Sequence, residues 1–136
     1  VTTYEIDPGF AENARANMEM GGVSDRVEVR TGDLTDELDE LAGDDPFDLI
    51  TLDTADAAAV VERAPELLVP GGYVAVYTPF VEDARDTELA AREAGLGDVE
   101  TLETIQRELT VDERGTRPST AGVGHTGYLL FARRVE

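Results

Sequence analysis

Residues 47–53, with the sequence FDLITLD, constrain the fold most, because they form a short and nearly continuous apolar run. A run of this length and composition predicts a strand, and its lack of a polar face is typical of a strand buried on both faces of a parallel sheet. An alanine-rich helical stretch follows at 55–68, and the run YVAVYT at 73–78 predicts another strand after a Pro-Gly-Gly break. This alternation of strand and helix indicates an α/β fold.

The amino-terminal third predicts the same alternation. Residues 1–6 (VTTYEI) have the β-branched and aromatic content of a strand. A helix follows, in which Asp7 can cap the amino end, Pro8 suits the first turn, and a Gly-Gly pair at 21–22 ends it. The next predicted elements are a strand at 27–30 and a short acidic helix within 34–41.

The last third of the chain changes character after a predicted helix at 82–94. Residues 99–109 and 126–135 predict two long strands joined by a polar connection, which suggests an antiparallel pair. We therefore predict an α/β sheet that is mostly parallel, with an antiparallel carboxyl-terminal strand pair and one reversed edge strand. The length of 136 residues suits a single domain covering 1–136.

The charge of the chain is strongly negative. There are 30 acidic residues against 11 basic ones, a formal net charge of −19, and every basic residue is arginine. An acidic surface around a core of ordinary hydrophobic content suits a cytoplasm of very high salt, where screening weakens self-repulsion, so we expect a salt-loving archaeal source. An ordinary acidic protein from a mesophile is the alternative.

The carboxyl-terminal segment is the only part that is not acidic. Residues 1–106 carry 26 acids and 6 arginines, whereas residues 107–136 carry 4 acids and 5 arginines. If the protein binds a polyanion, these arginines are the expected phosphate contacts. Pairing with the acidic remainder of the chain is an equal alternative. The five are Arg107, Arg114, Arg117, Arg133 and Arg134.

Several classes of protein are disfavoured by composition. The chain has no cysteine and one histidine, so thiolate sites and histidine clusters are excluded and only a carboxylate-based metal site stays open. We assign no residue as a metal ligand. There is no apolar run of about 18 residues and no export leader, so we expect a cytoplasmic protein without a membrane partner.

Residues 122–127 (GVGHTG) match the dinucleotide-binding pattern G-x-G-x-x-G. That pattern requires a preceding strand, a following helix and an acid about twenty residues further on, and the sequence here provides none of them. We interpret the segment as a flexible turn into the final strand.

Acidic residues follow three of the predicted strands, at Glu5, Asp33 and Asp53. Ligands of doubly wound sheets bind outside the carboxyl ends of the strands, so these positions are the candidate site. If the first strand here is second in the complete fold, Glu5 would accept ribose hydroxyls, and Asp33 could accept from the exocyclic amine of an adenine. In so acidic a chain any one of them can also be a solvated surface residue.

The order and spacing of YEIDPGFAENARAN, GDL, FDLITLD and LLVPGGYVAVYTP resemble those of Rossmann-like methyltransferases that use S-adenosylmethionine. The carboxyl-terminal ETIQREL and TRPSTAGVGHTGYLLFARR resemble, more specifically, tRNA (adenine-N1)-methyltransferases, which modify T-loop adenosine. The resemblance covers nearly the whole chain. In such enzymes a strand and glycine loop precede the acid-ended strand, so we expect that an amino-terminal part is missing and that this fragment binds cofactor poorly and is inactive.

The resemblance implies a role for each matching residue. Asp53 matches the catalytic aspartate of the family, and Glu5, Asp33 and Leu34 match cofactor-binding positions. The segment after Asp53 is TADAAAVV, where relatives usually carry proline and often an aromatic residue, and relatives tend to carry an amide after YTP. The resemblance also implies tRNA as partner and a tetrameric assembly. The implied substrate-binding residues are Arg107, Arg117, His125 and Thr126.

Two other functions stay open at this stage. The same fold could methylate a small molecule or a protein carboxylate, which is favoured if the arginines fold against the sheet. Alternatively, the chain could be a Rossmann-like module without catalytic activity that serves in assembly.

Overall fold

The structure is a computed structural model that describes residues 1–43, 45–122 and 124–136, without the side chains of His125 and Thr126. The chain divides into two compact units, Val1–Gly43 and Asp44–Glu136, and each is described by itself. The prediction of one domain over residues 1–136 therefore stays a prediction.

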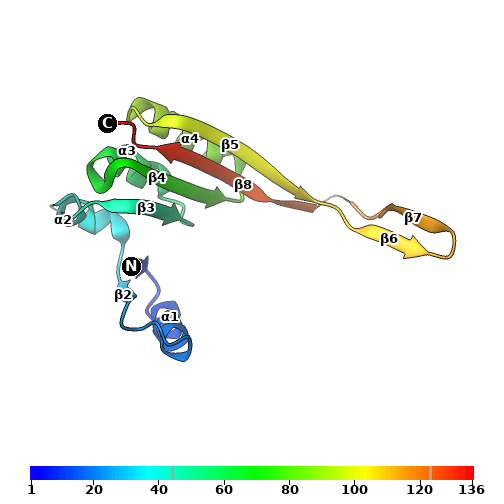
Figure 1. Ribbon diagram of the computed structural model, residues 1–136, viewed down its shortest axis with the longest axis horizontal. Coiled ribbons are helices and arrows are strands. Elements are labelled where there is room, and N and C mark those ends of the chain that lie inside the picture. Colours follow the sequence, from blue (N-terminus) through cyan, green and yellow to red (C-terminus); the bar gives the residue numbers. More distant parts are fainter. Residues whose placement is uncertain (44, 123) are drawn as a thin grey trace. The chain divides into compact units, whose positions relative to one another are not determined.

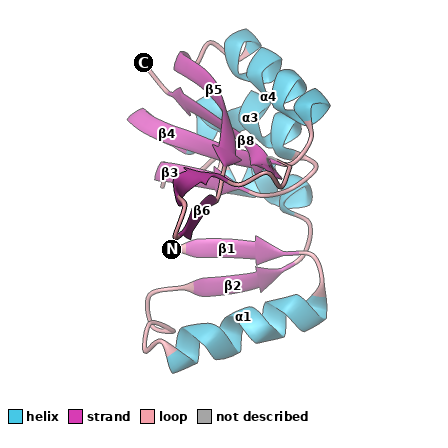
Figure 2. Cartoon of the chain, turned by 90° about the vertical axis from the view of Figure 1, so that its right-hand side faces the viewer, coloured by secondary structure: helices cyan, strands magenta, loops and turns pink. Residues whose placement is uncertain are grey.

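The first unit is a two-stranded parallel sheet with one long helix. Strands β1 (Thr2–Glu5) and β2 (Glu28–Thr31) pair in parallel, and α1 (Pro8–Met20) lies along them (Figure 2). Asp7 caps α1 as predicted, since its carboxylate accepts from the backbone N–H groups of the second and third helical residues. The short helices η1 (Leu34–Glu37) and α2 (Leu38–Leu41) follow β2, where an acidic helix is predicted.

The second unit is a four-stranded sheet with two helices and a hairpin (Figure 1). All strands and helices predicted for it are present, with boundaries shifted by a few residues. Its elements are β3 (Phe47–Leu52), α3 (Ala57–Leu67), β4 (Leu68–Thr78), α4 (Val81–Glu93), β5 (Gly97–Gln106), β6 (Leu109–Asp112), β7 (Gly115–Pro118) and β8 (Gly124–Arg133).

The strand order in this sheet is β3-β4-β8-β5. Strand β3 is parallel to β4, and β8 is antiparallel to both β4 and β5, so the antiparallel carboxyl-terminal pair is confirmed. The prediction that the reversed strand lies at an edge is wrong, because β8 is inserted between β4 and β5 and the edge strands are β3 and β5. Chain order cannot reveal this insertion, since it depends on pairing between residues that are far apart in sequence.

The core of this unit lies between the sheet and its two helices. Helices α3 and α4 pack on each other and cover the same face of the sheet, where Val74, Val76 and Leu130 are buried (Figure 2). The predicted burial of β3 on both faces is wrong in this structure, because Leu49 points away from these helices and is 56% exposed. In the described part of the chain, no helix is long and apolar enough to cross a membrane.

Strand β4 starts earlier than the sequence predicts, since it includes the Pro-Gly-Gly segment. Gly71 has a φ of +86°, and the backbones of Gly71 and Gly72 exchange hydrogen bonds with Arg134. A Cβ on Gly72 would lie 2.9 Å from the carbonyl oxygen of Val69, so this close approach requires glycine. The segment therefore acts as an irregular part of the strand rather than as its start.

The polar connection after β5 contains a hairpin that was not predicted. Strands β6 and β7 pair antiparallel, and Figure 1 shows the hairpin continuing outward from the ends of β5 and β8. Leu109 and Val111 alternate with polar residues in β6, and Gly115 begins β7 with a φ of +127°. These features are the hairpin signal that the polar composition of the segment obscures.

Candidate functional site

The carboxyl ends of β1 and β2 lie side by side in the first unit. Glu5 pairs in register with Thr31, and the N–H of Gly32 donates to the carbonyl oxygen of Glu5 at 3.0 Å. Asp33 follows one residue later. Glu5 and Asp33 are therefore brought to one edge of the same parallel pair, where ligands of α/β sheets bind.

Each carboxylate at this edge is held by its local backbone and, among the residues that the structure describes, has one oxygen without a hydrogen-bond partner. Oε1 of Glu5 accepts from the N–H of Asp7 at 2.9 Å. Oδ1 of Asp33 accepts from the hydroxyl of Thr35 at 2.7 Å and from its N–H at 2.8 Å. These two bonds, the hydroxyl bond first, hold the pKa of Asp33 below its ordinary value. Asp33 therefore offers an ionised acceptor to a ligand.

Leu34 begins η1, directly after Asp33. Its N–H is not bonded to any acceptor in the described part of the chain, because the hydrogen bonds of this turn start at Thr35 and Asp36. A free donor thus lies next to a free acceptor. An adenine ring presents an amine, which can donate to the carboxylate, and a ring nitrogen, which can accept from the N–H. The two protein groups are therefore complementary to the edge of an adenine.

A side-chain cluster connects η1 to the strands. The hydroxyl of Tyr4 donates to Oε2 of Glu37 at 2.8 Å and accepts from Arg30 at 2.9 Å. Burial, followed by the bond to Glu37, raises the pKa of Tyr4. The cluster fixes the turn that carries Asp33, so we assign it a structural role.

Several chain segments of the second unit meet at one edge of its sheet. Strands β3 and β4 are parallel, with Leu52 opposite Val76, so both end at this edge. Strand β8 runs the other way, with Tyr128 opposite Thr78, so its first residues extend past the end of β4. Strand β5 ends at Gln106, opposite Gly124. Gly124 lies four positions before Tyr128, which corresponds to about 13 Å along the strand.

Asp53 directly follows β3 at this edge and is exposed. Among the described residues its carboxylate has no hydrogen-bond or ion-pair partner, whereas other acids of the unit, such as Glu66 and Glu88, pair with arginine. A free carboxylate at a strand end can accept a hydrogen bond from a ligand or stabilise a positive charge on it.

The turn between β4 and α4 presents a ring beside this edge. Phe80 is 62% exposed, although its N–H is held by the buried Thr78 hydroxyl at 3.2 Å. Its carbonyl oxygen accepts from Ala84 in the first turn of α4. Phe80 is not among the residues predicted from the sequence, although the run Tyr-Thr-Pro-Phe at a strand end could have indicated it.

The predicted phosphate-binding arginines fall into three groups. Arg107 is exposed, lines a shallow hollow of about 400 Å³ at the base of the hairpin, and has no ion-pair partner among the described residues. The side chain of Arg114 at the hairpin turn is likewise unpaired within the described chain. Arg117 forms a 2.7 Å ion pair with Asp112 across the hairpin, and this bond lowers the pKa of Asp112.

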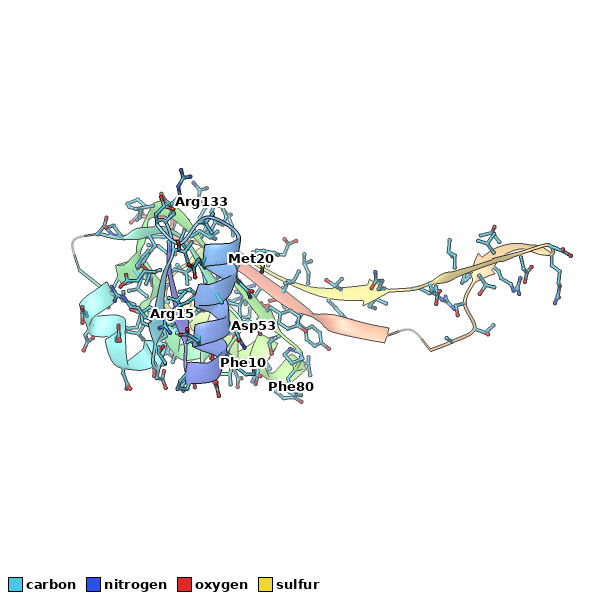
Figure 3. The ribbon with its side chains drawn as sticks, turned by 90° about the horizontal axis from the view of Figure 1, so that it is seen from below. Phe10, Arg15, Met20, Asp53, Phe80 and Arg133 are labelled. Carbon is cyan, nitrogen blue, oxygen red and sulfur yellow. The ribbon has the colours of Figure 1, made fainter. Side chains whose placement is uncertain are left out.

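The other two arginines of this segment have structural partners. Arg133 lies 5.6 Å from the centre of the Tyr73 ring and 3.8 Å from a carboxylate oxygen of Asp98. Arg134 donates to the carbonyl oxygen of Leu68. Arg133 is opposite Tyr73 in register, so it lies at the far end of β4 from Phe80 (Figure 3). The alternative of pairing with the acidic remainder of the chain thus applies to Arg133, whereas Arg134 is held by a backbone carbonyl oxygen.

The predicted substrate residues His125 and Thr126 lie in β8, and the backbone of His125 pairs with that of Ile105. Their side chains are outside the described residues, so their roles stay predictions. The last four residues of GVGHTG are part of this strand and pair with β5. The interpretation of these four residues as a flexible turn is therefore wrong, because the final strand begins within the motif.

The candidate residues thus form two groups, one in each unit. Glu5, Asp33 and Leu34 share an edge of the first unit. In the second unit Asp53 follows β3, and Arg107 follows β5 beyond the end of β4. The prediction that Glu5, Asp33 and Asp53 line one rim spans the two units and stays a prediction.

Known proteins that are similar to this chain include methyltransferases. The tRNA (adenine(57)-N(1)/adenine(58)-N(1))-methyltransferase TrmI of Methanocaldococcus jannaschii is 33% identical over 159 aligned positions, which cover 98% of this chain and 55% of that protein. A solved S-adenosylmethionine-dependent O-methyltransferase of Thermotoga maritima has a TM-score of 0.82 at 27% identity, covering 100% of this chain and 50% of that one. The fold is that of a Rossmann-like methyltransferase.

The resemblance to tRNA (adenine-N1)-methyltransferases is confirmed by a second homologue. TrmI of Thermus thermophilus, a tRNA (adenine(58)-N(1))-methyltransferase, is 28% identical over 135 positions, which cover 98% of this chain and 51% of that protein. The chain spans about half the length of the curated relatives it matches. No family model matches the sequence. In a methyltransferase fold, both groups of candidate residues occupy the ligand-binding ends of strands.

Proposed function

We propose that the protein is an S-adenosylmethionine-dependent methyltransferase that methylates N1 of adenosine in tRNA. The observation that carries this proposal is the similarity to TrmI, which extends over 98% of the chain and includes the arginine-bearing segment. The strand-end carboxylates support it, because they occur where this fold binds ligands.

The first unit fits the nucleoside half of the cofactor. The open oxygen of Glu5 is an acceptor for ribose hydroxyls, and the open oxygen of Asp33 is an acceptor for the adenine amine. The free N–H of Leu34 is a donor for a ring nitrogen of the same base. The donor and acceptor pattern of these three residues therefore suits an adenosine.

Asp53 is the proposed catalytic residue. When bound, the cofactor supplies a methyl group on a sulfonium, which an adenine N1 lone pair accepts in an in-line displacement that leaves the ring positively charged. The unpaired carboxylate of Asp53 can stabilise that charge and accept a hydrogen bond from the exocyclic amine. A strong base is not required, because N1 already carries a lone pair.

The hairpin side of the second unit is the proposed tRNA contact. Arg107 and Arg114 are available for phosphate, and Arg117 becomes available if its pair with Asp112 opens. His125 and Thr126 belong to the same strand end and are proposed to shape the pocket for the target base.

A second candidate is methylation of a small molecule. It is favoured by the similarity to the O-methyltransferase of Thermotoga maritima, whose TM-score is 0.82. It is also consistent with Arg133 and Arg134 folding against the sheet rather than forming a basic surface. A carboxylate at the position of Asp53 could also stabilise or orient a small substrate.

Two measurements test these proposals on the intact gene product. Calorimetric titration with S-adenosylhomocysteine is expected to show binding, and an absence of binding would remove every methyltransferase proposal and favour a non-catalytic module. Transfer of labelled methyl groups to unmodified tRNA, followed by nucleoside analysis, is expected to yield 1-methyladenosine. Transfer confined to small molecules would support the second candidate.

We also propose the setting in which the protein works. A tRNA-modifying role places it in the cytoplasm, and the net charge of −19 without lysine supports a cytoplasm of high salt, as in salt-loving archaea. A homo-oligomer, specifically a tetramer, is proposed from the resemblance, and sedimentation of the intact protein tests it.

A further inference from the structure

We propose that Phe80 is the stacking platform for the target base, so that the adenine is held between its ring and the strand edge that carries Asp53. This inference rests on the proposed function and assigns a specificity-determining residue to the same site. The segment after Asp53, TADAAAVV, contains no aromatic residue, and Phe80 would supply the ring instead.

The position of Phe80 is fixed although its side chain is exposed. Its N–H is bonded to the buried Thr78 hydroxyl, which donates in turn to Asp83, and its carbonyl oxygen accepts from Ala84. The residue thus caps α4 with extended backbone angles, φ −112° and ψ 134°. A ring that is 62% exposed on a fixed backbone loses little further backbone entropy when it contacts a flat ligand.

The register brings the turn that carries Phe80 close to Asp53. Leu52 is opposite Val76, so Asp53 and the final residues of β4 leave the sheet on neighbouring strands, which are about 4.8 Å apart. Figure 3 shows both side chains in the same region of the second unit. A purine on the Phe80 ring would therefore present its edge to the unpaired carboxylate.

The neighbouring aromatic residue Tyr77 is already engaged. A Cβ on Gly127 would lie 2.1 Å from the Tyr77 ring, so this ring packs over the backbone of β8. Tyr77 is 36% exposed, compared with 62% for Phe80. Of the two rings at this strand end, Phe80 has the more accessible face for a base.

Stacking also suits the chemistry of the proposed reaction. Every base has a π face, and aromatic stacking is a general way in which proteins hold unpaired bases. An adenine that gains positive charge at N1 is attracted to the face of an aromatic ring as well as to a carboxylate. Phe80 and Asp53 would thus stabilise the same developing charge from different directions.

The test compares Phe80→Ala, Phe80→Leu and Phe80→Tyr in the intact gene product, with Phe10→Ala as matched control because Phe10 is also exposed, at 65%, but lies on α1. The probes are S-adenosylhomocysteine by calorimetry, unmodified tRNA in methyl transfer, and a single-stranded RNA with one 2-aminopurine, whose fluorescence is quenched by stacking.

We expect Phe80→Ala and Phe80→Leu to raise KM for tRNA by about 10-fold or more and to lose the quenching. Phe80→Tyr and Phe10→Ala should resemble the wild type, and no variant should change S-adenosylhomocysteine affinity.

The outcomes separate this inference from the proposed function. If the wild type neither binds S-adenosylhomocysteine nor methylates tRNA, the proposed function fails, and the 2-aminopurine assay still decides whether Phe80 stacks on a base. If the wild type is active and Phe80→Leu keeps both its KM and the quenching, the stacking proposal is overturned. A change in oligomer mass for Phe80→Ala with an unchanged KM would also overturn it, because the ring would then serve assembly.

Discussion

The ring of Tyr77 on β4 lies over Gly127 on β8, so closely that a Cβ on Gly127 would come within 2.1 Å of it. Gly127 also has a φ of +135°, a backbone conformation that other residues adopt only with strain. We expect Gly127→Ala to lower the free energy of unfolding by roughly 1–3 kcal/mol, since the ring must move and the backbone is strained. Chemical denaturation measures this change.

Gly122→Ala is the matched control for this prediction. A Cβ at Gly122 meets no atom within 4 Å, and its φ is outside the strained region. We expect its unfolding midpoint to equal that of the wild type. Equal stability of the two variants would contradict the packing of Tyr77 over β8.

The pKa of Asp33 provides a second prediction. Thr35 lowers this pKa, mainly through its hydroxyl, so the ionised carboxylate contributes stability that is present above the unfolded pKa of about 4 and is lost as pH falls through the lower folded value. Thr35→Val removes the hydroxyl but keeps the N–H. We expect it to raise the Asp33 pKa in an NMR titration of the carboxyl carbons.

Thr3→Val is the control for the titration, because Thr3 lies on β1 and, in the described part of the chain, makes no hydrogen bond to Asp33. It should leave the Asp33 titration unchanged. If Thr35→Val does not raise the pKa, the turn that holds this carboxylate is assigned wrongly, and so is the orientation proposed for cofactor binding.

The elements of the fold were predictable where local chemistry decides them. The cap at Asp7 and the apolar run in β3 are signals within a few residues, and both elements appear where expected. The placement of β8 between β4 and β5 could not be predicted, because it depends on pairs such as Tyr73 with Arg133, which are 60 positions apart in the sequence. The hairpin was missed because its polar residues resemble a loop.

The candidate site was predictable to a similar extent. Acids at strand ends are visible in the sequence, and the register confirms that Glu5 and Asp33 share one edge. The exposure of Phe80 and the pairing of Arg117 with Asp112 could not be predicted, because both depend on how turns fold back on neighbouring strands. The structure therefore separates available arginines from those already paired.

The catalytic assignment predicts a selective loss of activity. Asp53→Ala removes the only charge expected to stabilise the methylated ring, so methyl transfer to tRNA should fall by roughly 100-fold or more in kcat. The affinity for S-adenosylhomocysteine should not change. Asp56→Ala is the control, since Asp56 lies in the same loop and its side chain makes no capping bond to α3. Equal losses for the two variants would remove Asp53 from the mechanism.

The arginines of the second unit should differ in their effect on tRNA binding. Arg107→Ala removes an unpaired cation, so we expect weaker binding and a decrease of about one in the slope of log affinity against log salt. Arg117→Ala should have a smaller effect, because phosphate must compete with Asp112 at 2.7 Å. Arg85→Ala on α4 is the control, and filter binding at several salt concentrations measures all three. An Arg85 effect as large as that of Arg107 would indicate nonspecific attraction.

The surface charge predicts that salt stabilises the fold. At a net charge of −19 the carboxylates repel one another, and raising KCl from roughly 0.1 M to 1 M shortens the screening length from about 10 Å to about 3 Å. Some of the ion pairs are solvent-exposed, as in Arg85 with Asp86, so their loss at high salt costs little. We therefore expect Tm to rise with KCl.

A triple variant, Glu19→Lys, Glu62→Lys and Glu93→Lys, should show a weaker dependence of Tm on KCl, because it removes repulsion at exposed positions. A Tm that falls with salt would show that attraction between charges dominates, and the proposed high-salt setting would then be wrong.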